Sequence, residues 1–303
     1  MANITAKDVA SLRERTGVGM MDCKKALVEA EGDVEKAIVI LREKGLATQA
    51  KKAGRVAAEG IVASVVEGNV GAVVEVNSET DFVANTDQFK SFVAMVAKTI
   101  IEANPADIEA LKASKAAGSD KTIEEELQEV FLKIRENIQI RRFVRLEGNL
   151  VSYVHGEGRI GVMVQMDTDL GEKANACGKD VALQVAAMNP SYLDRNSVPA
   201  DVIDGEKKVI MGQMAEDPKM ANKPEAVLSK IAEGKLGKFY TENCLVDQEF
   251  VKDGEYTVGK YVDKCAKDLG GSIKVVNYVR FERGEGIAKR EDNFADEVAS
   301  MIK

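Results

Sequence analysis

The chain has 303 residues, of which 45% are hydrophobic and 30% charged, a balance typical of folded globular proteins and unlike that of disordered ones. The net charge of −8 would repel phosphate groups, so we expect no direct nucleic-acid binding, although residues 1–55 carry 11 basic against 8 acidic side chains. No apolar run reaches the ~20 residues that span a bilayer, and the N-terminus lacks a signal-peptide core, so we expect a cytoplasmic protein without membrane contact.

Residues 1–54 are predicted to form a domain of three short helices. Thr5 followed three residues later by Asp8 resembles a capping box at the start of the first helix. Asp33 is a typical cap for the third helix, and Gly45 is expected to end it. The small and basic stretch after Gly45 is then expected to be a linker.

The stretch T-G-V-G-M-M, residues 16–21, separates the first two helices and has two interpretations. Val18, Met20 and Met21 either fill gaps in the core of the helical domain or form an adaptable apolar loop that contacts a partner. Flexible thioether side chains suit both roles. The pattern alone does not choose between them.

An internal repeat predicts the architecture of the central part. E-G-I-V-A-S-V-V-E-G-N-V-G-A-V-V-E-V (59–76) aligns with residues 147–166, and each copy reads as a β-hairpin with glycine in the turn. Each is followed by apolar-periodic helices and a closing strand, 138–147 and 273–282. We therefore expect an α+β fold with two antiparallel three-stranded sheets, in subdomains 55–146 and 147–199 with 240–282.

The second copy carries an insertion. Residues 200–239 have helical apolar spacing interrupted by Pro218 and Pro224, which predicts a helical hairpin that projects from the core. Its apolar stripe is narrow and suits either self-packing or a partner, including dimerisation with a second copy. Residues 283–303 are predicted to form a C-terminal helical module.

Two motifs that are typical of enzymes have simpler explanations. G-E-G-R-I-G, residues 156–161, matches a dinucleotide fingerprint, but a strand rather than a helix follows it, so we interpret these glycines as hairpin residues. His155 is the chain's single histidine and has no catalytic or metal-binding partners nearby in sequence. Four cysteines without a C-x-x-C pair indicate free thiols.

The stretch N-S-E-T-D-F-V-A-N-T-D-Q-F, residues 77–89, places an aromatic side chain in polar surroundings. Thr80 and Asp81 favour a turn or helix cap, and Thr86 is a cap for the helix that follows. Phe82 either folds back onto that helix, as most large aromatics are buried, or is exposed for another protein.

Three separated motifs together resemble the bacterial elongation factor Ts family. They are R-T-G-V-G-M-M-D-C-K-K-A-L near the N-terminus, E-V-N-S-E-T-D-F-V-A in the middle and R-F-E-R-G-E-G-I near the end. The resemblance implies that residues 1–54 have a fold like that of ubiquitin-associated domains. It also implies nucleotide exchange on the GTPase elongation factor Tu, without covalent catalysis and without a cofactor.

The resemblance also assigns partner contacts. Thr80, Asp81, Phe82 and Val83 would enter the GTPase near its magnesium site, with the aromatic ring as wedge. Docking contacts would come from Val18, Met20, Met21, His155 and Phe294. Accelerating release ~10⁴-fold requires about 5–6 kcal/mol, more than the roughly 1.5–3 kcal/mol from burying one phenylalanine, so we expect several anchors.

One position departs from the family pattern, because Gln184 stands where a histidine is common. A partner contact through that histidine is not expected here. Two other functions remain as hypotheses. One is a protein-binding scaffold without exchange activity, and the other is an enzyme with an unrecognised site around His155 or Cys265.

Overall fold

The structure is a computed structural model that describes residues 4–217 and 223–288. Its N-terminal bundle consists of α1 (Ala6–Thr16), α2 (Met20–Glu29) and α3 (Val34–Lys52). The predicted capping box is present, since the Asp8 N–H donates to Thr5 Oγ1 at 3.3 Å and the Thr5 N–H donates to Asp8 Oδ2 at 2.8 Å. The three predicted helices are thus confirmed, around a small core that includes Leu12, Leu27 and Leu41.

The prediction that Gly45 ends the third helix is wrong. α3 continues to Lys52, so most of the predicted linker is helical. Gly45 lies where α3 approaches α7 (Ile123–Ile134), and a Cβ at this position would clash with the Leu132 side chain. Glycine is therefore present for close helix packing rather than as a stop signal.

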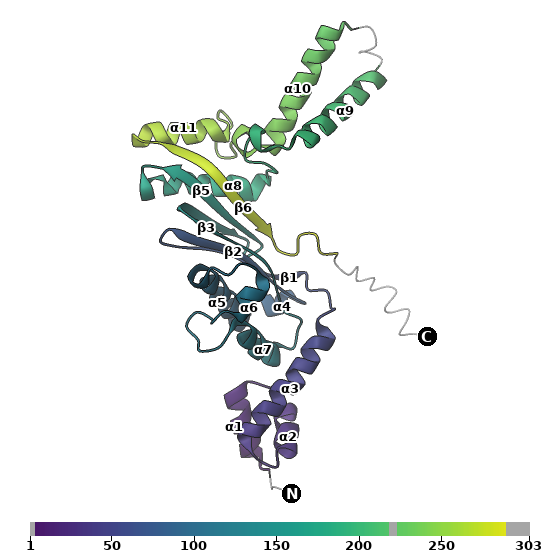
Figure 1. Ribbon diagram of the computed structural model, residues 1–303, viewed down its shortest axis with the longest axis vertical. Helices are drawn as coiled ribbons and strands as arrows, with labels where there is room; N and C mark the ends of the chain where they lie inside the picture. Colours follow the sequence, from purple (N-terminus) through teal and green to yellow (C-terminus); the bar gives the residue numbers. More distant parts are fainter. Residues whose placement is uncertain (1–3, 218–222, 289–303) are drawn as a thin grey trace.

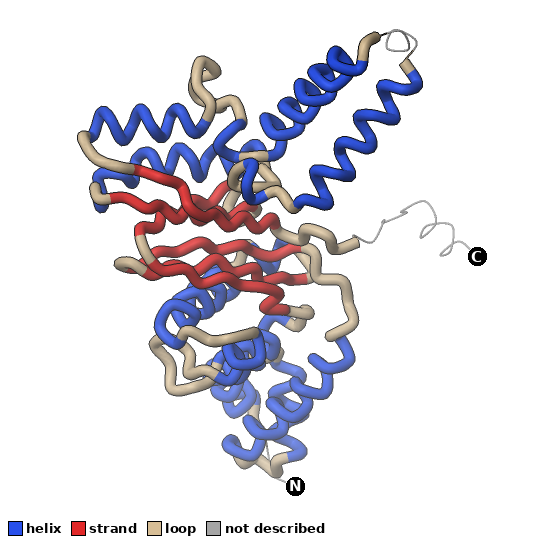
Figure 2. Tube along the Cα trace, turned by 45° about the horizontal axis from the view of Figure 1, so that its top comes forward, coloured by secondary structure: helices blue, strands red, loops and turns tan. Residues whose placement is uncertain are grey.

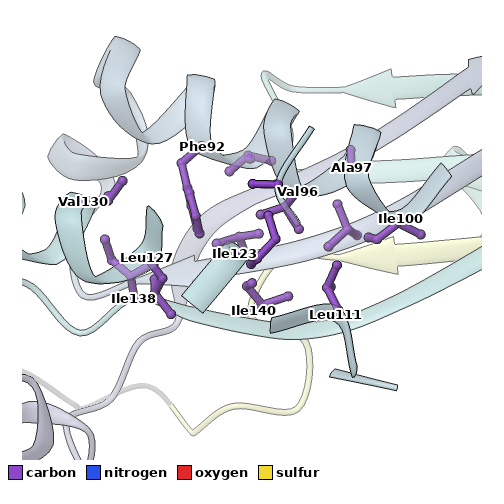
Figure 3. Close-up of a cluster of buried hydrophobic side chains, with 14 of the residues drawn as sticks. Phe92, Val96, Ala97, Ile100, Leu111, Ile123, Leu127, Val130, Ile138 and Ile140 are labelled. Carbon is purple, nitrogen blue, oxygen red and sulfur yellow. The ribbon is translucent and has the colours of Figure 1, made fainter. Parts of the chain in front are cut away.

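The first half of the core is a three-stranded antiparallel sheet with helices on one face. The strand order is β1 (Glu59–Glu67), β2 (Val70–Ser78), β3 (Gln139–Glu147). The helices beside it are α4 (Asp81–Ala84), α5 (Asp87–Ala103), α6 (Ile108–Ala113) and α7. Figure 3 shows the apolar layer between sheet and helices, with Phe92, Val96 and Ile100 from α5 among its members.

The second half repeats this plan. Its sheet has the order β4 (Asn149–His155), β5 (Ile160–Thr168), β6 (Ile273–Glu282) and packs against α8 (Asn175–Met188) and α11 (Val258–Leu269). Short 3-10 helices lie at Gly171–Ala174, Arg195–Ser197 and Leu245–Asp247. Both central strands have an irregularity at the same repeat position, between Glu75 and Val76 and between Gln165 and Met166, which supports the duplication.

The two sheets pack face to face between the two helical layers, as Figures 1 and 2 show. A small apolar cluster of Val62, Val73, Leu150 and Met163 fills the space between them. Glycines bring the sheets close, because a Cβ at Gly161 would lie 2.5 Å from Val62 Cγ1. The predicted hairpin role of G-E-G-R-I-G is confirmed, and its last glycine also permits the contact between the sheets.

The insertion forms α9 (Ala200–Glu216) and α10 (Glu225–Asn243), which project from the second half at the end opposite the N-terminal bundle (Figure 1). Pro224 directly precedes α10, and Pro218 lies outside the described residues. Ile210 and Met214 of α9 are buried. Among the described helices, none is both long enough and apolar enough to cross a membrane.

Candidate functional site

One end of the core carries the stretch around Phe82. β1 begins at this end and β2 finishes there, since Glu59 pairs with Ser78. The chain then turns through Glu79 and forms the single-turn helix α4, which packs against β1 (Figure 1). We call this end of the two sheets the α4 edge.

Thr80 fixes the start of α4. Its Oγ1 accepts from the Val83 N–H at 3.4 Å and donates to Glu136 Oε1 at 2.7 Å, while its own N–H donates to Glu136 Oε2 at 3.0 Å. The adjacent Glu79 carboxylate accepts from the Asn137 N–H at 2.7 Å. These bonds tie α4 to the loop after α7, so the helix has a fixed place on the surface.

α4 presents two side chains to solvent and packs the other two inward. Ala84 is buried and Val83 is half-buried against the core of the first half, whereas Asp81 is exposed and Phe82 is 83% exposed. The interpretation that Phe82 folds back onto the next helix is therefore wrong. The exposed ring is therefore available for contact with another protein.

We expect Thr80→Val to lower the free energy of unfolding by about 1–2 kcal/mol, because it removes the helix cap and the hydroxyl bond to Glu136. Thr48→Val is the control, since that exposed hydroxyl bonds only to Lys44 O within α3 and its loss should cost less than about 0.5 kcal/mol. Urea unfolding measures both. Equal losses would show that Thr80 does not fix α4.

His155 lies at the same edge. It is the exposed last residue of β4 and pairs with Ile160, which in turn pairs with Glu282 at the end of β6. The turn after it touches β1, because the Val62 N–H donates to Gly158 O at 2.8 Å. The fold thus brings His155 and Phe82, from different halves of the repeat, to one end of the core.

α1 and α2 lie at the far end of the helical bundle from the α4 edge (Figure 1). Met20 and Met21 begin α2 rather than a loop, and they are 52% and 64% exposed. Val18 is fully buried in the bundle core, because Gly17 adopts a left-handed conformation with φ 68° and turns the chain inward. Docking through Val18 is therefore incorrect, and contact through the two methionines stays a prediction.

Two further predictions concern the C-terminal module and the inserted hairpin. Phe294 lies outside the described residues; of the predicted C-terminal module only 283–288 are described, and they form turns rather than a helix. On the inserted hairpin, Val209, Met211 and Val227 are exposed. Dimerisation through that surface stays a prediction.

Gln184 is a structural residue. It is fully buried in α8, where its Nε2 donates to Gln248 Oε1 at 3.2 Å and to Glu249 O at 3.0 Å, and its Oε1 accepts from the Val251 N–H at 2.9 Å. The amide thereby fixes the loop between α10 and α11. Its position inside the protein leaves no direct route to a partner.

Gln184→Leu should lower the free energy of unfolding by about 2–4 kcal/mol, because buried backbone groups of the 248–251 loop lose their partners. Gln184→His keeps one donor and one acceptor and should lose less. Gln213→Leu removes an exposed amide and serves as the control, with an expected change below about 0.5 kcal/mol. A loss for Gln184→Leu no larger than for this control would contradict the assignment.

The hypothesis of an enzyme built on His155 or Cys265 gains no support from their positions. His155 lies where β6 ends, whereas Cys265 lies in the last part of α11, before β6 begins. Cys265 packs beside Cys177, whose thiol pKa is raised by burial and by Cys265. A raised pKa disfavours the reactive thiolate form of Cys177.

A buried carboxylate near the α4 edge was not predicted from the sequence. Glu75 is fully buried in β2, and its oxygens accept from Asn77 Nδ2 at 3.0 Å, Arg141 Nη1 at 3.0 Å, Arg142 Nε at 2.6 Å and the Gly284 N–H at 2.8 Å. Burial raises the pKa of this carboxyl, but these hydrogen bonds outweigh burial and hold the pKa below its ordinary value. A charged residue inside the run V-V-E-V was the available signal.

Comparison with known proteins identifies the family of this chain. The family model described as elongation factor TS matches residues 79–285. Proteins named elongation factor Ts from Syntrophotalea carbinolica and Clostridium kluyveri are each 47% identical, and both alignments cover 99% of this chain and 99% of the relative. That of Clostridium perfringens is 48% identical over 98% of this chain and 99% of its own length. The chain therefore belongs to the elongation factor Ts family.

Proposed function

We propose that this protein is a guanine nucleotide exchange factor for elongation factor Tu, which it binds in the GDP-bound and the nucleotide-free form. The observation that carries the proposal is the 83% exposure of Phe82 on a helix fixed by Thr80 and Glu136. Family membership supports the choice of partner. An exposed ring on a rigid support can enter a partner without first losing contacts of its own.

In the proposed mechanism, Thr80, Asp81, Phe82 and Val83 enter the GTPase beside its magnesium site. Mg²⁺ bridges nucleotide phosphates and oxygen ligands of a GTPase, so displacing the ion and the phosphate loop weakens the hold on GDP. The two ligands of the GTPase are then coupled negatively, and GDP must weaken binding of the factor by the same factor. GTP can bind once GDP has left.

This mechanism needs no acid, base, nucleophile or cofactor in the exchange factor, because no covalent bond of the nucleotide changes. It needs binding energy that is realised when the nucleotide site opens. Burying Phe82 supplies roughly 1.5–3 kcal/mol. Met20, Met21, His155 and Phe294 are proposed as the further docking contacts.

The proposal also divides the chain into five parts, which are residues 1–54, 55–146, 147–199 with 240–282, 200–239 and 283–303. Each part would offer a separate contact or support to the GTPase. A cytoplasmic location follows from the proposed partner.

Stopped-flow release of a fluorescent GDP from purified elongation factor Tu tests the proposal. Addition of this protein should accelerate release in a manner that saturates with its concentration. Release at the spontaneous rate, with binding still visible in a pull-down, would favour the alternative of a scaffold without exchange activity. Absence of both binding and acceleration would overturn the proposed partner.

A further inference from the structure

Glu75 is fully buried on the face of β2 that meets the second sheet. In β2, residues 74 and 76 face the helices of the first half, while Val73 faces the second sheet in the cluster between the sheets. Because side chains alternate along a strand, Glu75 lies on the same face as Val73. Burying a carboxylate there is costly unless charged and polar groups surround it.

The groups that surround Glu75 come from two distant parts of the chain. Arg141 and Arg142 belong to β3, and the Gly284 N–H belongs to the segment after β6. The same arginines also hold that segment, since Arg141 Nη2 donates to Glu285 O at 2.5 Å and Arg142 Nη2 donates to Glu285 Oε2 at 3.0 Å. Glu75 is therefore the centre of an ion cluster that seats residues 282–285 on the first sheet.

The second half of the repeat shows that the fold itself does not require this charge. Gln165 occupies the equivalent position in β5, beside the same strand irregularity. Its amide donates to Glu147 O at 2.8 Å. The carboxylate in the first half is therefore explained by its contacts with the segment after β6, because the sheet itself accepts an uncharged side chain at the equivalent position.

This segment lies at the α4 edge. Arg283 pairs with Glu59 at 3.0 Å, at the start of β1, and its N–H donates to Arg159 O at 2.8 Å, beside the turn that carries His155. Gly284 has φ 69° and lies so close to Ala58 O that a Cβ would clash with it. Figure 1 shows α4, the start of β1 and the chain beyond β6 on the same side of the molecule.

We propose that Glu75 is a positioning residue for partner docking, which seats residues Arg283–Ile287 at the α4 edge as a contact surface for elongation factor Tu next to Phe82. The inference rests on the proposed function and adds one more contact to those proposed above. Glu285 and Gly286 are exposed on this segment, so the seated chain faces solvent beside α4. Glu75 itself is buried and acts through the segment.

The test compares Glu75→Gln and Gly284→Ala with the natural chain in the stopped-flow release of fluorescent GDP. The first variant removes the charge that holds both arginines. The second adds a Cβ that clashes with Ala58 O and so displaces the segment, while the residues of the sheet stay unchanged. Gly68→Ala is the matched control, because Gly68 has a similar left-handed φ of 61° in the turn of the first hairpin but nothing within 4 Å of an added Cβ.

We expect both variants to raise the concentration needed for half-maximal acceleration about tenfold and to leave the maximal rate unchanged, since a docking contact is lost while Phe82 is intact. The control should behave like the natural chain. Concentrations are corrected for the folded fraction measured by circular dichroism. If Glu75 only stabilised the fold, the half-maximal concentration would not differ from that of the natural chain after this correction. If Glu75→Gln does not fold, Gly284→Ala decides.

Two results would overturn the inference while leaving the proposed function in place. One is that Gly284→Ala needs the same concentration for half-maximal acceleration as the natural chain. The other is that the variants lower the maximal rate without a shift in that concentration. Absence of acceleration by the natural chain would instead overturn the proposed function itself, and the positioning role with it.

Discussion

Phe82→Ala should lower the maximal rate of GDP release from elongation factor Tu about 10- to 100-fold, while the free energy of unfolding changes by less than about 0.5 kcal/mol. The rate falls because the roughly 1.5–3 kcal/mol from burying the ring in the partner is lost in the open state of the nucleotide site. Stability is retained because the side chain is 83% exposed and contributes little to the core. Stopped-flow release and urea unfolding provide the two measurements.

Leu269→Ala is the control for this variant. Leu269 is 42% exposed at the end of α11, so the substitution also removes exposed apolar surface, but away from the α4 edge. Its maximal rate should equal that of the natural chain. A natural maximal rate in Phe82→Ala would refute the role of the ring as wedge.

Phe89→Ala should lower the free energy of unfolding by about 3–5 kcal/mol, which is the usual cost of emptying a buried phenylalanine site. Phe89 is fully buried in the core of the first half. It lies in α5, seven residues after Phe82. Where the variant remains folded, its maximal exchange rate should stay close to the natural value, because the ring makes no contact with a partner. Urea unfolding at low temperature and the release assay test both parts.

The two alanine variants form a matched pair, because each removes the same atoms from neighbouring helices. One should change exchange and spare stability, and the other should do the reverse. Equal losses of stability in both variants would mean that Phe82 is packed in solution, which would contradict the exposure on which the proposed function depends.

The duplicated core explains how one edge can carry several contacts. In both halves, the first strand of the hairpin and the closing strand run between the same two ends of the core. Stacking the sheets places the start of β1, the turn after β4 and the end of β6 together. Residues separated by more than two hundred positions, such as Glu75 and Gly284, are brought into contact in this way.

Local signals in the sequence predicted most of the elements, although not the end of α3. Thr5 and Thr86 cap helices as their positions predicted, because a cap depends on the hydroxyl and on backbone groups three residues away. Runs of β-branched residues separated by glycine turns predicted the hairpins for the same reason, and the repeat gave their pairing into two sheets. The polar surroundings of Phe82 kept its exposure open as one of two interpretations.

Only the tertiary structure decided which side chains are buried and by what. Val18 lies in the bundle core, Gly45 continues a helix because Leu132 of α7 lies against it, and Gln184 supports a loop about 65 residues further along. The ion cluster of Glu75 likewise depends on a segment that follows the last strand. Sequence periods describe neighbours within a few residues, whereas these contacts join parts of the chain that meet only after the sheets have stacked.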